Sequence, residues 1–120
     1  MTSLQHRLDD VVIAIVHSLL AERCPPQRAE EEGLENEVAR RVIEHVRRMP
    51  DWTRQGIRAL LAVFDRAGLV AFHCAPARAR ARRLEAWRRS PLGPQRDFVR
   101  LFESLSVYTW RGLVEARTGA

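Results

Sequence analysis

Lysine is absent from this chain, and cysteine is nearly so. All 20 basic residues are arginine, and the two cysteines, Cys24 and Cys74, stand fifty positions apart. That spacing matches neither a metal-binding knuckle nor a redox Cys-x-x-Cys motif, so we interpret both as buried or idle thiols. A GC-rich coding sequence is enough to account for the exclusive use of arginine. We therefore do not treat it as evidence for arginine-specific recognition.

Long hydrophobic runs are also missing. The run at residues 11–16, which no other exceeds, is far shorter than the ~20 apolar residues that a membrane span needs. It follows two aspartates and lacks the basic start and small-residue cleavage site of a secretory leader. The Arg-Arg pairs all lie inside the chain, where none is expected to act as a twin-arginine export signal. We therefore expect no membrane partner and a cytoplasmic location.

The motifs of common catalytic and cofactor sites are missing as well. The six glycines form neither a dinucleotide fingerprint nor a P-loop, and the four histidines show no i, i+4 pair. His73 and Cys74 are the one adjacent pair of good nucleophile or metal-ligand types, and we interpret them as a helix end. The sequence thus predicts no catalytic residue, no metal site and no cofactor in this chain.

What the chain does contain is a repeated helical pattern. Its 120 residues, 46% hydrophobic and 29% charged, suit one soluble globular domain spanning 1–120. Apolar residues recur at i, i+3 and i+4 along each long segment, and prolines or glycines separate the segments. We predict an all-α fold, a single compact domain of about five helices, over residues 4–23, 34–49, 51–72, 76–89 and 95–116. Asp51 is the expected N-cap of the third helix.

Positive charge is concentrated in residues 77–89. Six arginines stand there against Glu85 alone, a local charge of +5 that equals the formal net charge of the whole chain. Such a helix could follow a phosphate backbone, but Glu85 lies where it can pair with Arg82 and Arg89. A solvated face, a nucleic-acid contact and a docking surface for an acidic protein remain open, and we favour the docking surface.

Tryptophan is the other conspicuous feature, at positions 52, 87 and 110. Each side chain can belong to the core, but tryptophan and arginine are also the residues enriched in interface hot spots. Trp87 and Trp110 both stand next to arginine. The predicted partner-binding residues are therefore Arg78, Arg82, Arg83, Trp87, Arg89 and Trp110.

A resemblance to a known family enters through the second half of the chain. Its order is Arg82-x-Leu84-x-x-Trp87-x-x-Ser90-Pro-Leu, then Arg96-x-Phe98-x-x-Leu101-x-x-x-Leu105-x-x-Tyr108. This resembles the small (gamma) subunit of flavin-dependent sugar and alcohol dehydrogenases, the gluconate 2-dehydrogenase subunit 3-like family. It is also similar to the helical segment preceding the flavin domain of long-chain fatty alcohol oxidases. The helix over 4–20 and the stretch 49–65 fit the same layout, so the resemblance covers most of the chain.

The resemblance implies a noncatalytic, chaperone-like accessory subunit. Its partner would be the large subunit of an oxidoreductase complex, a glucose–methanol–choline (GMC) type flavoprotein that holds the FAD and performs catalysis. Small subunits of this family often carry the export leader, so its absence here predicts a cytoplasmic complex, periplasmic only if the partner carries the signal. The alternative is a small basic helical nucleic-acid-associated protein. An enzyme ranks last, with His73 and Cys74 as its candidates.

Overall fold

All five segments predicted as helices are helical in the computed structural model, which describes residues 2–24, 33–66 and 71–118. No strand occurs within these ranges, so the all-α prediction is confirmed. The elements are α1 (Thr2–Arg23), α2 (Leu34–Arg47), α3 (Asp51–Asp65), the short 3-10 helix η2 (Phe72–Cys74), α4 (Ala77–Arg88) and α5 (Gly93–Thr118).

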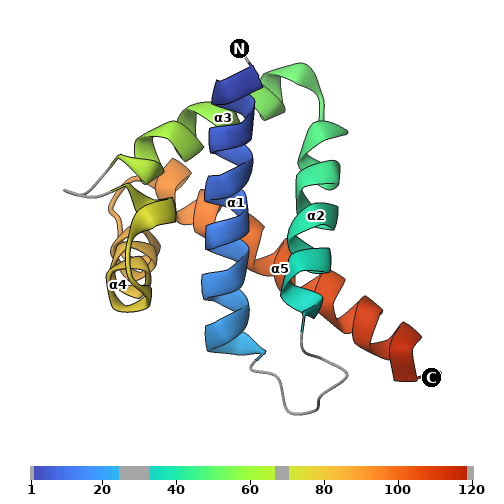
Figure 1. Cartoon of the computed structure of the whole chain (residues 1–120). Helices are drawn as coiled ribbons and strands as arrows, with labels where there is room; N and C mark the ends of the chain where they lie inside the picture. Colours follow the sequence, from blue (N-terminus) through green and yellow to red (C-terminus); the bar gives the residue numbers. More distant parts are fainter. Residues whose placement is uncertain (1, 25–32, 67–70, 119–120) are drawn as a thin grey trace.

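Helix α1 lies at the centre of the fold and packs against every other element. Figure 1 shows α1 and α2 side by side, with α5 crossing behind both and its C-terminal end extending past α2. The central position of α1 follows from its sequence, because it is apolar around most of its circumference. Val11, Ile15 and Leu19 on successive turns are fully buried. Burial therefore outweighs the weak helix propensity of its β-branched residues.

Aromatic rings from α3, η2, α4 and α5 form one continuous cluster beside α1. The ring of Phe64 lies 4.6 Å from that of Phe72, 4.8 Å from that of Trp87 and 5.5 Å from that of Phe98, between centroids. Phe98 in turn lies 5.0 Å from Phe102. Tilted and edge-on pairs at these separations add stability beyond the area they bury. This cluster fixes α4 and α5 against α3.

The predicted end of the third helix was wrong. We expected it to continue to about Phe72, but α3 ends at Asp65. In a continuous helix, Phe64 and Phe72 would be separated by roughly 12 Å along the axis, whereas their rings are in contact. Burial of Phe72 against Phe64 is therefore favoured over continuation of the helix. Gly68, a glycine within the range predicted for this helix, lies outside the described residues.

Two helix starts also differ from expectation by one position. The N-cap of α3 is Pro50, and Asp51 is the first helical residue, where its carboxylate still faces the positive end of the helix dipole. Pro76 occupies the N-cap of α4 rather than its first turn.

Gly33 precedes α2 with φ of 84°, a conformation that glycine adopts without strain. Among the described helices, none combines the length and apolarity needed to cross a bilayer.

Candidate functional site

Three of the six arginines in the basic segment point into the protein, and two of these bind backbone carbonyls. Arg80 donates from Nε to the carbonyl oxygen of Phe72 (3.1 Å) and from Nη2 to that of His73 (2.7 Å). Arg83 Nη1 donates to the carbonyl oxygens of Phe64 (3.2 Å) and Asp65 (3.1 Å). Phe64 and Asp65 end α3, and the last carbonyls of a helix have no partner within it. The carbonyl oxygen of Phe72 in η2 also accepts the N–H of Ala75 (3.1 Å). Arg80 and Arg83 thus act as C-terminal caps supplied by α4.

The same two guanidinium groups lie over the ring of Phe72. The Cζ atoms of Arg80 and Arg83 are 5.7 Å and 5.6 Å from its centroid. Both separations fall within the range of cation–π attraction. The ring is fully buried, so these contacts help to hold η2 against α4.

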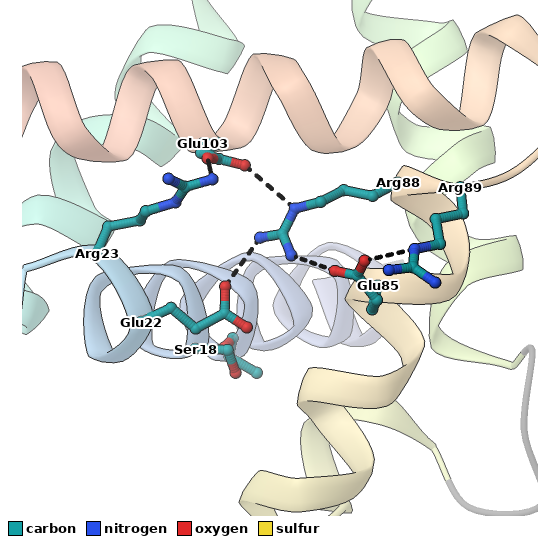
Figure 2. A network of polar contacts seen from close by, with 8 residues as sticks. Ser18, Glu22, Arg23, Glu85, Arg88, Arg89 and Glu103 are labelled. Atoms are coloured by element: carbon teal, nitrogen blue, oxygen red, sulfur yellow. Dashed lines mark hydrogen bonds and ion pairs between the residues drawn. The ribbon is translucent and has the colours of Figure 1, made fainter.

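Arg88, the third inward arginine, lies at the meeting point of α1, α4 and α5 (Figure 2). Its guanidinium pairs with Glu22 of α1 (2.8 Å), Glu85 of α4 (2.9 Å) and Glu103 of α5 (3.4 Å). Glu103 also pairs with Arg23 at the end of α1. The Arg88 side chain is only 23% exposed. A planar guanidinium suits this position, because its five N–H groups can serve several carboxylates at once.

The network changes the proton affinities of its members. Burial lowers the pKa of Arg88, but the hydrogen bonds to Glu22 and Glu85 outweigh burial and raise it above the ordinary value. The hydrogen bond from Arg88 is the largest effect on Glu85 and lowers its pKa; burial opposes this, and the charges of Arg89 and Arg88 lower the pKa further. Both groups therefore remain charged at neutral pH.

The remaining three arginines, Arg78, Arg82 and Arg89, are exposed. Arg89 pairs through Nε with Glu85 (2.8 Å), and its side chain is 81% exposed. The sequence predicted ion pairs of Glu85 with Arg82 and Arg89. In the structure, Glu85 pairs with Arg89, and its second partner is Arg88 rather than Arg82. The basic segment is consequently less of a free surface than its charge suggests.

The tryptophans do not extend this surface. Trp87 is 5% exposed within the aromatic cluster, so the prediction that it lies on a docking face is corrected: it belongs to the core. Trp110 is half-buried and packs against the core. Trp52, by contrast, is 80% exposed on α3. The six predicted partner-binding residues are therefore not brought together on one face.

A different basic surface appears where the end of α1 meets α5. It is a groove of about 870 Å³, which we call the arginine groove. Its charged members are five arginines and one glutamate, which is Glu103. The residues that line it are Arg23, Cys24, Arg88, Arg96, Arg100, Glu103, Ser104, Val107, Tyr108 and Arg111.

Tyr108 is the exposed aromatic side chain of the arginine groove. The apolar periodicity of residues 95–116, which runs through Phe98, Leu101 and Leu105, predicts that Tyr108 lies on the buried stripe of the last helix, but it is 81% exposed. The buried stripe follows Phe98, Val99 and Phe102 instead. The missed signal was the spacing of four that joins Arg96 and Arg100 to Ser104 and Tyr108, because residues four apart lie along one face of a helix. That line forms the wall of the groove.

His73 and Cys74, the candidates for an enzyme site, have ordinary structural surroundings. His73 Nδ1 lies 2.9 Å from Asp65 Oδ1, and the backbone N–H of His73 donates to the same oxygen at 3.3 Å. Asp65 is buried, and this contact ties η2 to the end of α3. Cys74 is exposed and Cys24 half-buried, so of the two interpretations of these cysteines as buried or idle thiols, burial does not apply to Cys74. Within the described ranges, no three His, Cys, Asp or Glu residues gather as a metal site.

Comparison of the chain with protein-family models, with curated proteins and with solved structures gives no match. The resemblance to the gluconate 2-dehydrogenase small subunit therefore stays a sequence-based prediction, and the groove is interpreted from its own geometry.

Proposed function

We propose that this chain is a noncatalytic accessory subunit that docks a larger protein through the arginine groove and stabilises it. The observation that carries the proposal is the exposure of Tyr108, 81%, among the arginines of that groove. The surface fits an acidic partner. On the sequence resemblance, we take this partner to be a GMC-type FAD-dependent oxidoreductase.

The groove has the two components of an interface hot spot. Its arginines offer planar, bidentate donors for carboxylates, and Arg100 and Arg111 are exposed among the residues that line it. Tyr108 supplies the apolar anchor, and burying such a ring stabilises a complex by roughly 1.5–3 kcal/mol. An acidic segment that covers Tyr108 would neutralise the arginines beside it.

The arginine groove is also held in place before any partner binds. Arg88 and Arg23 are both fixed by Glu103, which ties α1 and α4 to the middle of α5. A surface that is already ordered loses less entropy on binding than a flexible one. The inward arginines and the exposed arginines of the groove therefore have complementary roles, the first stabilising the fold and the second presenting charge to the partner.

In this proposal, FAD and catalysis belong to the partner. Binding to the folded form of that partner stabilises it by mass action. Removing the small subunit should therefore reduce the amount of soluble, FAD-loaded enzyme, whereas the turnover of each remaining flavin stays unchanged.

The test is deletion of this chain in its native cells, followed by two measurements on the oxidoreductase fraction. We expect less bound flavin in the soluble fraction and unchanged turnover per flavin. Purification of the tagged chain should yield a yellow, flavin-absorbing companion protein. Capture of nucleic acid without a flavoprotein by the folded chain would contradict the proposal and support the nucleic-acid alternative.

A further inference from the structure

Helix α3 presents an outward face without a single charged residue, in a chain that is 29% charged. The exposed residues between its two ends are Trp52, Gln55, Gly56, Ala59, Ala62 and Val63. Trp52 is 80% exposed and Val63 is 55% exposed. This face is distinct from the arginine groove, which is built from α1, α4 and α5.

Gly56 is not required by the fold of this chain. It stands in the middle of α3 with an ordinary helical backbone, and a Cβ atom added to it would meet nothing within 4 Å. Glycine weakens the interior of a helix relative to alanine. Such a residue is useful where another backbone must approach closely, and no described element of this chain approaches Gly56.

The sizes of the residues along this face follow the same order in both directions. Trp52, Gly56, Ala59 and Val63 follow one another at spacings of four, three and four. Their sizes are large, small, small and large. About a two-fold axis between antiparallel helices each contact occurs twice with the partners exchanged, so an axis between Gly56 and Ala59 places the small residues at the crossing and the large ones at its two ends. Gly56 would then face Ala59 of the second copy, and Trp52 would face Val63.

Charge at the two ends of the helix fits the same arrangement. Asp51 stands at the N-terminal end, where its pair with Arg54 leaves its side chain 86% exposed. Arg66, directly after the C-terminal end, is exposed. Antiparallel pairing brings Asp51 of one copy near Arg66 of the other, and does so twice.

We propose that this face of α3 is a self-association surface, on which a second copy of this chain packs antiparallel about a two-fold axis between Gly56 and Ala59. The small residues at the crossing allow close approach of the two helices, and the two tryptophans cover the ends. The contact area of a single helix pair is modest, so the dimer is expected in the micromolar range rather than the nanomolar range.

Sedimentation of the whole purified chain over a series of concentrations tests this proposal. We expect a reversible monomer–dimer equilibrium in the wild type and a dissociation constant raised at least about ten-fold by Gly56→Leu. The matched control is Gly112→Leu on α5, since Gly112 also has open space around it. This control should dimerise as the wild type does. Thermal melting of dilute samples will show that both variants fold.

Charge reversal gives a second measurement on the same surface. Asp51→Arg should weaken the dimer, and adding Arg66→Asp to it should restore the wild-type affinity. A wild type that stays monomeric to near-millimolar concentration, or a Gly56→Leu variant that dimerises as tightly as the wild type, overturns the proposal. Changes in the arginine groove should leave dimerisation unaltered, so this inference and the docking function can fail separately.

Discussion

Arg82 and Arg83 are neighbours in the sequence with opposite surroundings in the structure. Arg83 donates to the last carbonyl oxygens of α3, whereas Arg82 is exposed. A carbonyl that loses its partner inside the protein destabilises the fold by about 1–3 kcal/mol. We expect Arg83→Met to lower the free energy of unfolding by that amount and Arg82→Met to change it by less than about 0.5 kcal/mol. Urea unfolding of both variants measures the difference, and equal effects would contradict the capping role.

Arg88 and Arg89 form a second such pair. Arg88, 23% exposed, joins three carboxylates from three helices, and Arg89, 81% exposed, joins one. We expect Arg88→Met to lower the free energy of unfolding by about 1–3 kcal/mol, between the values typical of exposed and of buried ion pairs. Arg89→Met should lower it by less than about 1 kcal/mol. The same urea titration measures both losses. A larger loss of unfolding free energy for Arg89→Met than for Arg88→Met would contradict the role of Arg88 in joining the three helices.

The lowered pKa of Glu85 predicts how this network responds to acid. Its carboxyl releases a proton more readily in the folded state than in the unfolded state, because Arg88 donates a hydrogen bond to it. Its stabilising contribution is therefore complete above the ordinary value of 4.5 and is lost as the pH falls through the lower folded value. The difference in urea midpoint between wild type and Glu85→Gln should shrink toward zero in acid. A difference that does not depend on pH would contradict this assignment.

At the scale of elements, the sequence predicted the helices well and their surfaces poorly. Periodicity and breakers located all five helices, because each must bury an apolar stripe. The end of α3 was missed, since the return of Phe72 onto Phe64 is a contact between two segments that periodicity cannot reveal. Tyr108 was assigned to the buried stripe for a similar reason. Which flank of α5 is covered depends on where α1 and α4 end.

Charge was the least reliable guide to the surface that we propose for docking. The segment 77–89 holds the whole net charge of the chain, yet Arg80, Arg83 and Arg88 are engaged by carbonyls and carboxylates. A sequence gives the number of arginines on a helix but not which of them meet orphan carbonyls at the end of another helix. The arginine groove is assembled from α1, α4 and α5, and its position follows only from the crossing of these helices.

At the scale of the whole molecule, Trp87 holds α4 against α3 and α5 within the aromatic cluster of the core. It contacts the rings of Phe64 and Phe98 at 4.8 Å and 5.2 Å. We expect Trp87→Ala to lower the free energy of unfolding by about 3–5 kcal/mol. The exposed Trp52 provides the control, and Trp52→Ala should change it by less than about 0.5 kcal/mol in dilute solution. Thermal melting distinguishes the two, and a mild effect at Trp87 would place that side chain outside the core.

In the proposed function, the molecule separates stabilising arginines from docking arginines, and this separation is the central claim. Capture of the flavoprotein from native cells by three tagged chains tests it most directly: wild type, Arg100→Glu with Arg111→Glu in the arginine groove, and Arg78→Glu with Arg82→Glu on α4. The measured quantity is flavin absorbance per captured chain. Our account predicts that the groove variant loses the flavin signal and that the α4 variant keeps it. Loss of the signal in the α4 variant with full retention in the groove variant would contradict the account.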